Sequence, residues 1–214
     1  MKASQPVRGL YAITPDRADT GALISEVRQA LEGGARLIQY RNKSADEALR
    51  LRQARRLVAL CSEYEALLII NDSVALAKKS GAHGVHLGRD DVAIHAAREQ
   101  LGAAKIIGAS GYTSIERARA AESQGADYVA FGSFFASTVK PDASRAPLAL
   151  LSDAKARIAI PIVAIGGITL DNAPVLIEAG ADGLAVISAL FGAPDIHQAA
   201  RQFVGMFKAS SCRI

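Results

Sequence analysis

The alternation of short apolar runs with longer amphipathic stretches constrains the fold of this 214-residue chain more than any other feature, and we count eight of each. The apolar runs predict strands near residues 9–14, 36–41, 67–72, 84–88, 105–110, 128–133, 161–166 and 183–188. The amphipathic stretches predict helices near residues 21–32, 45–63, 73–79, 92–101, 114–124, 148–157, 172–178 and 196–207. Because the runs lack polar alternation, they are typical of parallel strands that helices cover on both faces.

Eight strand–helix units favour an α/β fold with a closed (β/α)8 barrel, the TIM barrel. An open, doubly wound sheet is the alternative. No linker, charge run or change of composition divides the chain, and half of its residues are apolar. We therefore expect a single (β/α)8 barrel domain over residues 1–214, with residues 1–8 as a flexible N-terminal extension.

A Gly-Ala pair recurs at alternate junctions of these units. The pairs begin at Gly34, Gly81, Gly125 and Gly180, and each precedes an even-numbered predicted strand. Glycine can adopt the left-handed conformation that ends a helix. The repeat therefore supports the count of eight units.

Charge and cysteine content exclude several classes of protein. The net charge of +4 is dispersed, and the densest cluster, four arginines within residues 50–56, lies in one predicted helix without an aromatic residue. A solvated helix face explains this cluster better than a nucleic-acid site. Cys61 and Cys212 show neither metal-ligand spacing nor a disulfide framework. With no apolar segment typical of a leader or a membrane span, we expect a cytoplasmic protein.

Acidic residues follow the third and fourth predicted strands. The third ends in Asn71 and Asp72, and the fourth leads to Asp90 and Asp91. In a parallel barrel these ends meet at the carboxyl edge, where active sites lie. Two carboxylates converging there can bind Mg²⁺ together with phosphate oxygens. The alternative is that they cap the helices that follow.

Cationic residues are predicted at the same edge. Gln39, Arg41 and Lys43 alternate at the end of the second strand, and Lys140 lies in the long connection over residues 133–145. Arginine and lysine beside a metal site suit a polyphosphate. A polar inner layer without a ligand would also place the first three residues on one face.

The last two strands end in a different kind of sequence. Gly166 and Gly167 follow the seventh strand, and Ser188 follows the eighth. TIM barrels commonly bind a single phosphate there through backbone N–H groups. A simple turn would explain the two glycines equally well.

Histidines give little support for a metal or a nucleophile. His83 and His86 resemble a zinc pair, but on a strand this spacing directs them to opposite faces. We expect His86 to be a hydrogen-bonded strand residue and His83 to lie at the surface. Neither a Ser-His-Asp set nor a Cys-His pair is evident, so nucleophilic hydrolysis is disfavoured.

Nine segments of the chain resemble the thiamine phosphate synthase family. They occur in the order of the family and span Gly9 to about Phe191. The segments are GLYAITPD, IQYRNK, LLIIND, GVHLGRDD, IIGAS, ADYVAFGSFF, TVKPD, PIVAIGGIT and AVISA. The resemblance implies a (β/α)8 transferase that joins hydroxymethylpyrimidine diphosphate to a thiazole phosphate, giving thiamine phosphate and pyrophosphate.

The resemblance also implies roles for individual residues. The pyrimidine diphosphate site would comprise Gln39, Tyr40, Arg41, Asn42, Lys43, Asn71, Ser110 and Lys140. The thiazole phosphate site would comprise Ser137, Thr138, Val139, Gly167, Ile187 and Ser188. Asp72 and Asp91 would bind Mg²⁺, and the catalytic residues would be Arg41, Lys43, Ser110 and Lys140.

The implied mechanism is dissociative. Mg²⁺ and the cations would stabilise departing pyrophosphate, the thiazole nitrogen would capture the pyrimidine carbocation, and residues 133–145 would form a lid. One departure from the family pattern is Val139, where a second threonine is common. Alternative functions are a thiazole tautomerase and a non-catalytic ligand-binding relative. We expect small phosphorylated partners and neither nucleic acid nor membrane, and a homodimer is an open alternative.

Overall fold

The computed structural model describes residues 7–136 and 145–211 of the chain. Eight parallel strands pair in sequence order and close into a barrel, because β1 pairs with both β2 and β8. The strands are β1 (Gly9–Ile13), β2 (Leu37–Tyr40), β3 (Leu67–Asn71), β4 (Gly84–Leu87), β5 (Ile106–Tyr112), β6 (Tyr128–Phe131), β7 (Ile162–Ile165) and β8 (Gly183–Val186). The predicted (β/α)8 barrel is confirmed, and the open sheet is excluded.

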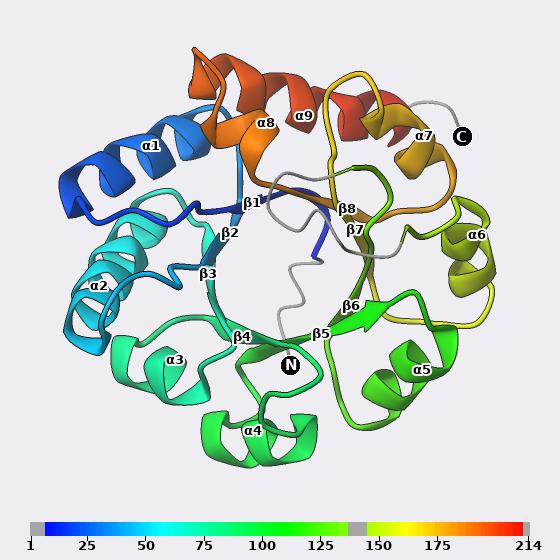
Figure 1. Cartoon of the computed structure of the whole chain (residues 1–214), viewed down its shortest axis with the longest axis horizontal. Coiled ribbons are helices and arrows are strands. Elements are labelled where there is room, and N and C mark those ends of the chain that lie inside the picture. Colours follow the sequence, from blue (N-terminus) through cyan, green and yellow to red (C-terminus); the bar gives the residue numbers. More distant parts are fainter. Residues whose placement is uncertain (1–6, 137–144, 212–214) are drawn as a thin grey trace.

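Helices form a ring around the barrel (Figure 1). They are α1 (Thr20–Glu32), α2 (Glu47–Glu63), α3 (Val74–Ser80), α4 (Ile94–Leu101), α5 (Ile115–Ser123), α6 (Ala149–Lys155), α7 (Ala173–Glu178), α8 (Ser188–Phe191) and α9 (Ile196–Ser211). Two differences from the prediction bear on the site. The short helix α8 was not expected, and β5 continues past Ser110 to Tyr112 through an irregular register with β6.

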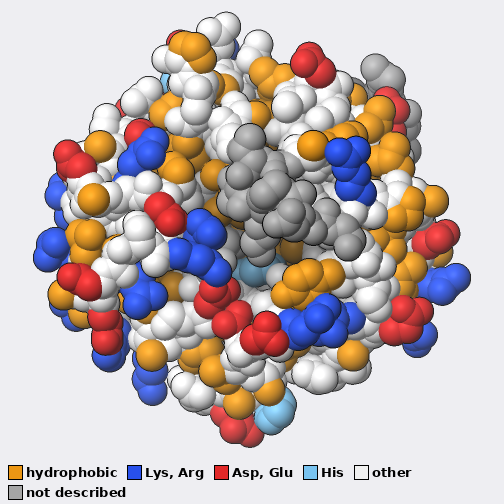
Figure 2. Space-filling model, in the orientation of Figure 1, with side chains coloured by type: hydrophobic (Ala, Val, Ile, Leu, Met, Phe, Trp, Pro, Cys, Tyr) orange, Lys and Arg blue, Asp and Glu red, His pale blue; other side chains and the backbone are white. Residues whose placement is uncertain are grey.

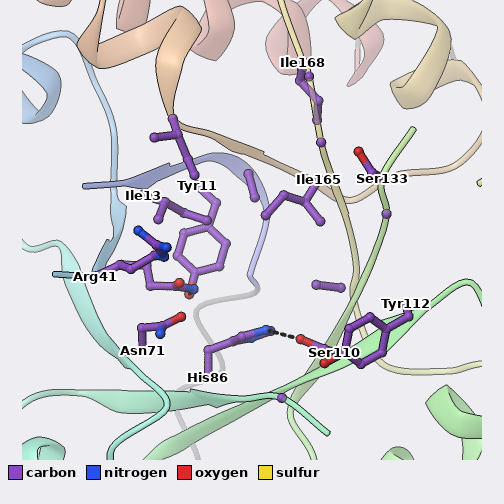
Figure 3. Close-up of a pocket in the computed structure, with 18 of the residues that line it drawn as sticks. Tyr11, Ile13, Arg41, Asn71, His86, Ser110, Tyr112, Ser133, Ile165 and Ile168 are labelled. Atoms are coloured by element: carbon purple, nitrogen blue, oxygen red, sulfur yellow. Dashed lines mark hydrogen bonds between the residues drawn. The ribbon is translucent and has the colours of Figure 1, made fainter. Parts of the chain in front are cut away.

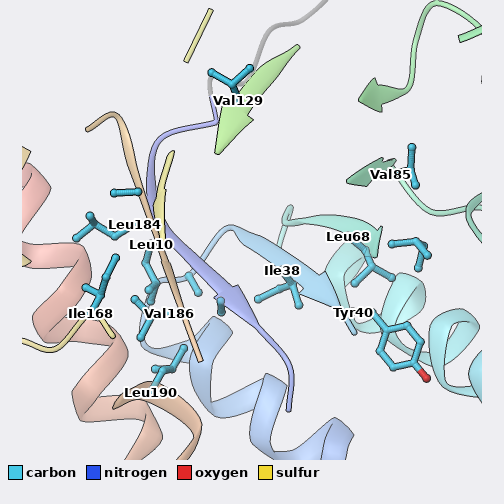
Figure 4. Close-up of a cluster of buried hydrophobic side chains, with 14 of the residues drawn as sticks. Leu10, Ile38, Tyr40, Leu68, Val85, Val129, Ile168, Leu184, Val186 and Leu190 are labelled. Carbon is cyan, nitrogen blue, oxygen red and sulfur yellow. The ribbon is translucent and has the colours of Figure 1, made fainter. Parts of the chain in front are cut away.

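The larger hydrophobic core lies between the strands and the helices. Strand residues that face outward, among them Leu10, Ile38 and Leu68, pack there against helix residues such as Leu57 (Figure 4). Tyr40 belongs to this layer, and its hydroxyl donates a 2.6 Å hydrogen bond to Gln53 Oε1 on α2. Burial on both faces explains why the strands read as continuous apolar runs.

A second, smaller cluster fills the interior of the barrel. It contains residues of the opposite strand face, including Tyr11, Ile13, Leu37 and Tyr128. Val7 belongs to the same cluster and is buried, so this part of the predicted N-terminal extension packs inside the barrel. Residues 1–6 of that extension lie outside the described residues.

The four Gly-Ala junctions have the predicted conformation. The glycines have φ values of 102° at Gly34, 78° at Gly81, 91° at Gly125 and 108° at Gly180. The alanine that follows each glycine is buried at the entry to its strand. The pair thus ends a helix and begins a strand within two residues. Among the described residues, no helix is long and apolar enough to cross a membrane.

Candidate active site

A cavity of about 990 Å³ opens at the carboxyl ends of the strands (Figures 2 and 3). Its wall includes most of the predicted site residues that the structure describes. These are Gln39, Arg41, Lys43, Asn71, Asp72, Asp91, Ser110, Gly167, Ile187 and Ser188. The cavity is large enough for more than one small molecule, since drug-sized ligands occupy about 300–1,000 Å³.

Arg41 is fixed at the end of β2 by two residues that follow β1. The hydroxyl of the fully buried Thr14 donates to the Arg41 carbonyl and accepts from its N–H, both at 3.0 Å. Asp16 accepts a 2.9 Å bond from the Arg41 guanidinium and a 3.1 Å bond from the N–H of Lys43. The guanidinium therefore lies at the cavity wall in a defined orientation (Figure 3).

Asp72 and Asp91 lie together on the same side of the cavity. Lys43 Nζ is 3.7 Å from Asp72 Oδ2, and the N–H of Gly88 donates a 2.7 Å bond to Asp91 Oδ2. Burial raises the pKa of Asp91, the nearby charge of Asp72 raises it further, and the Gly88 N–H and the Lys43 charge act against this rise. The charge of each carboxylate is therefore felt by the other, and Lys43 lies close enough to act on both.

The alternative prediction, that these carboxylates cap the helices that follow, is wrong. The hydroxyl of Ser73 caps α3 by accepting from the N–H of Leu76, and the residue at the start of α4 is Ala93. Asp72 instead has a positive φ of 64°, which is unusual for a residue other than glycine. Such conformations cluster at functional sites.

The donor set suits a hard divalent cation. Mg²⁺ usually binds one or two protein carboxylates and completes its shell with water and phosphate oxygens. Within residues 7–136 and 145–211, no group of three or more His, Cys, Asp or Glu side chains could hold a metal ion by itself. A metal held by Asp72 and Asp91 would therefore complete its shell with water or with oxygens of a bound substrate.

The opposite side of the cavity, beyond β6, β7 and β8, is built from small residues and backbone. Gly167 has a φ of 61°, and a Cβ added there would lie 2.2 Å from the carbonyl oxygen of Ala136. A Cβ on Gly166 would lie 2.2 Å from Ser133 Oγ. Only glycine allows the loops after β6 and β7 to approach so closely. Ser188 begins α8 and is exposed to the cavity.

Among the described residues, the charged side chains that line the cavity all follow β2, β3 or β4. In Figure 2, acidic and basic side chains cluster beside the central hollow, on the side where Figure 1 shows β2, β3 and β4. The residues of this charged side are Arg41, Lys43, Asp72, Arg89, Asp90 and Asp91. We call it the charged side, and the wall formed after β6, β7 and β8 the glycine side.

A chain of hydrogen bonds crosses the floor of the cavity. Gln39 Nε2 lies 2.8 Å from the Tyr11 hydroxyl, which lies 2.8 Å from the Tyr128 hydroxyl. His86 Nδ1 lies 2.9 Å from the Tyr128 hydroxyl, and His86 Nε2 lies 2.9 Å from Ser110 Oγ (Figure 3). The predicted hydrogen-bonded role of His86 is confirmed.

Comparisons with known proteins show the family to which this chain belongs. The family model described as thiamine monophosphate synthase matches residues 10–190. The chain belongs to the thiamine monophosphate synthase family. It is therefore an enzyme, a transferase of thiamine biosynthesis.

Relatives in the family match nearly the whole chain. A thiamine-phosphate synthase of Thiobacillus denitrificans is 55% identical over 201 residues, which is 94% of this chain and 95% of the relative. One from Chromobacterium violaceum is 55% identical over 203 residues, covering 95% and 98% of the two chains. The solved thiamine phosphate pyrophosphorylase of Pyrococcus furiosus is 39% identical, with a TM-score of 0.84 over 94% of this chain and 96% of that one.

Two residues that the family resemblance assigned to the pyrimidine diphosphate site do not face the cavity. The Tyr40 side chain lies in the outer core, and the buried Asn42 donates to the Arg17 carbonyl at 2.7 Å and to Gln53 Oε1 at 3.1 Å. These side chains point away from the cavity because residues 40 and 42 alternate with residues 39 and 41 along the strand. Residues 40 and 42 could therefore contact a diphosphate only through their backbone, and their assignment to that site stays a prediction. The predicted Ser137, Thr138, Val139 and Lys140 lie outside the described residues.

Some residues in and around this cavity were missed or misplaced by the sequence analysis. Asp16, Tyr11 and Tyr128 were not predicted, although Tyr11 shares strand parity with Ile13 in the first apolar run and points inward. His83 was expected at the surface, but it is partly buried and its Nδ1 accepts a 2.9 Å bond from the N–H of Leu68. Burial lowers the pKa of His83, and the charge of Lys105 lowers it further.

Proposed function

We propose that this enzyme condenses 4-amino-2-methyl-5-hydroxymethylpyrimidine diphosphate with thiazole phosphate, forming thiamine phosphate and pyrophosphate with the assistance of Mg²⁺. One observation carries the proposal. Two carboxylates and two cations converge on one side of a cavity whose opposite side is built from backbone and small residues. This arrangement suits a metal-bound diphosphate facing a monophosphate.

Asp72 and Asp91 would hold Mg²⁺, in keeping with the chemistry of two carboxylates at adjacent strand ends. When bound, the ion would neutralise negative charge on the diphosphate oxygens. The charge of Asp72 contributes, after burial, to the raised pKa of Asp91, and repulsion between these two carboxylates would be offset by a bound cation.

The cations of the charged side would stabilise the leaving group. Arg41 can bind two phosphate oxygens through its planar guanidinium, and Lys43 supplies a point charge. Asp16 holds Arg41 before substrate arrives, so little reorganisation is needed when charge develops. A preorganised group of this kind typically contributes about 10²–10³ in rate. Lys140 remains a predicted third cation.

In the proposed reaction, the bond between the pyrimidine methylene carbon and the diphosphate oxygen breaks, and both electrons leave with pyrophosphate. The aminopyrimidine stabilises the resulting carbocation, and the thiazole nitrogen forms the new bond to the same carbon. Gln39, Asn71 and Ser110 line the cavity where they can orient the pyrimidine ring. Holding both partners in one cavity supplies the proximity that the second step requires.

The thiazole phosphate would bind on the glycine side. Positive φ values at Gly166 and Gly167 turn the backbone around the cavity, and Ile187 and Ser188 complete this wall. Backbone N–H groups in loops after the last barrel strands commonly bind one phosphate. Binding through the main chain would be insensitive to valine at position 139.

A thiazole tautomerase is the nearest alternative function. Proton transfer on a thiazole phosphate would require neither the two carboxylates nor the cations of the charged side. Arg41, Lys43, Asp72 and Asp91 all line the cavity, which favours condensation. A non-catalytic relative would have no need of a preorganised arginine.

The test is to incubate the enzyme with both substrates, with and without Mg²⁺, and to measure pyrophosphate and thiamine phosphate. We expect equal amounts of both products, formed only when Mg²⁺ and both substrates are present. Isomerisation of the thiazole phosphate without pyrophosphate would instead identify a tautomerase. Binding of both ligands without turnover would identify a non-catalytic relative.

A further inference from the structure

We infer that the chain of hydrogen bonds from Gln39 through Tyr11, Tyr128 and His86 to Ser110 has one direction and sets the polarity of the cavity floor. In this direction Ser110 is held as a hydrogen-bond donor and the Gln39 amide oxygen as an acceptor. Tyr11, Tyr128 and His86 act as positioning residues. The choice of pyrimidine as the ligand rests on the proposed function, whereas the direction of the hydrogen bonds does not.

The geometry is continuous and buried. The four contacts measure 2.8, 2.8, 2.9 and 2.9 Å, and the relative exposures of Tyr11 and Tyr128 are 1% and 0%. The two tyrosine rings meet edge to face at 5.9 Å, and the His86 ring stacks on Tyr128 at 5.5 Å. Packing of this kind fixes the orientation of each ring, and so limits the hydrogen-bond partners within reach of its polar atoms.

The direction follows from counting protons. An amide nitrogen can only donate, so the Tyr11 oxygen accepts from Gln39 Nε2 and the single Tyr11 proton is directed to Tyr128. The Tyr128 oxygen then accepts, and its own proton is directed to His86 Nδ1. An imidazole whose Nδ1 accepts carries its proton on Nε2, and this N–H donates to Ser110 Oγ.

The hydrogen-bond chain requires the hydroxyls of Tyr11 and Tyr128 to remain protonated, and their burial favours the protonated form. Burial raises the pKa of Tyr11 well above its ordinary value, although its hydrogen bonds with Tyr128 and Gln39 oppose the rise. Burial also raises the pKa of Tyr128, and the neighbouring Tyr11 raises it further. Neither hydroxyl therefore loses its proton near neutral pH.

The consequence concerns which ligands the floor accepts. Because Ser110 Oγ accepts from His86, its own proton is directed to the ligand, and Gln39 presents its amide oxygen. A ring with one exocyclic amino group and a ring nitrogen matches this polarity. A ring with an oxo group in place of the amino group would meet the Gln39 oxygen with an acceptor, and unpaired buried polar groups are what discriminate strongly between such ligands.

The first test reads the direction without any activity. Nitrogen NMR of the whole enzyme, labelled at histidine, reports which ring nitrogen carries the proton, and a His86→Gln spectrum identifies the His86 signals among the four histidines. We expect a neutral His86 with its proton on Nε2 at pH 7. A proton on Nδ1, or on both nitrogens, would overturn the inference, whatever reaction the enzyme catalyses.

The second test separates positioning from general destabilisation. Tyr128→Phe should lower the single-turnover rate of pyrophosphate formation about tenfold, since one hydrogen bond at Ser110 is no longer fixed. In a Ser110→Ala background the same change should have no further effect. The matched control is Tyr64→Phe, which removes a hydroxyl bonded to Arg28 and Glu32 outside the barrel and should leave the rate unchanged.

An equal loss of rate from Tyr128→Phe in both backgrounds would show that Tyr128 acts only through stability, and would overturn the inference. Tyr128→Phe should also narrow the preference of the enzyme for amino over oxo pyrimidine diphosphates. If the wild-type enzyme released no pyrophosphate at all, the proposed function would fail while the NMR result still decided the direction of the chain.

Discussion

The two sides of the cavity bring different chemical groups to one ligand site. The charged side, formed after β2, β3 and β4, projects long charged side chains and fixes them with partners such as Asp16. The glycine side, formed after β6, β7 and β8, projects few side chains and brings the backbone close to the cavity. In the proposed function, the same fold would thus bind anions through side chains in one place and through its main chain in another.

This difference predicts opposite responses to mutation. On the charged side, function depends on atoms that a substitution removes. On the glycine side, function depends on space that a substitution fills. Truncations should therefore be most damaging after β3 and β4, and additions should be most damaging after β7.

The largest effect should come from removing either of the two carboxylates proposed to hold Mg²⁺. Asp72→Ala and Asp91→Ala should each lower kcat by roughly 10²–10³, because a site for charge stabilisation is lost. The response of the rate to Mg²⁺ should weaken in both variants, as titrations of steady-state activity would show. Asp90→Ala is the matched control and should have a mild effect, because Asp90 is exposed at the rim. A severe effect at Asp90 with a mild one at Asp91 would reverse the assignment.

The next largest effect should come from adding one methyl group to the glycine side. Gly167→Ala places a Cβ against the Ala136 carbonyl oxygen and should raise the KM for thiazole phosphate roughly 10- to 100-fold, since the strain of ~1–2 kcal/mol adds to the clash. Gly180→Ala is the control, because it also has a positive φ but its nearest added contact is 3.6 Å away at Lys155. It should lower Tm and leave both KM values unchanged. Equal KM values in the two variants would contradict a phosphate site here.

A smaller effect should follow from loosening Arg41 without removing it. Asp16→Asn keeps the shape of the side chain but weakens its hold on the guanidinium, and should raise the KM for the pyrimidine diphosphate about five- to tenfold. The KM for thiazole phosphate should not change. Glu26→Gln is the control, because Glu26 forms a similar 3.0 Å ion pair with Arg17 away from the cavity wall. An unchanged KM for the diphosphate in Asp16→Asn would show that Arg41 is positioned by other contacts.

The smallest effect should appear in the stability of the metal-free protein. The raised pKa of Asp91 means that the folded state binds this proton more tightly than the unfolded state. The resulting stabilisation is present below the ordinary pKa of aspartate and is lost as the pH rises through the raised value. Asp91→Asn should therefore increase Tm in EDTA at pH 7 but not at pH 3. A difference in Tm that did not change with pH would contradict the burial of a charge at Asp91.

The positions of the strands could be predicted from the sequence because parallel strands covered by helices must be apolar throughout. Each predicted strand lies within two residues of the observed one, and the Gly-Ala junctions have the expected conformation. The short helix α8 was missed because four residues carry no helical periodicity. The continuation of β5 to Tyr112 was missed because a register irregularity has no clear sequence signal.

The candidate site could be predicted only in part, for a reason specific to barrels. The charged residues after β2, β3 and β4 stand out in the sequence because they interrupt apolar runs. Tyr11 and Tyr128 do not, since a tyrosine within an apolar run suits either face of the barrel wall. The alternation of side chains along a strand does carry this information. Applied to residues 39–42, it predicts that the side chains of Tyr40 and Asn42 face the outer layer.

Closure of the barrel joins the first strand to the last, with Gly9 opposite Gly183 and Ala12 opposite Val186. Contacts this distant along a chain are costly in entropy and slow to form. Tyr11, on β1, belongs to the cavity floor, and Asp16, just after β1, holds Arg41 of the charged side. The glycine side, in contrast, is completed only after β8. Nearly the whole chain must therefore be synthesised before the cavity can form with both of its sides. Until then the nascent polypeptide lacks one wall of the cavity.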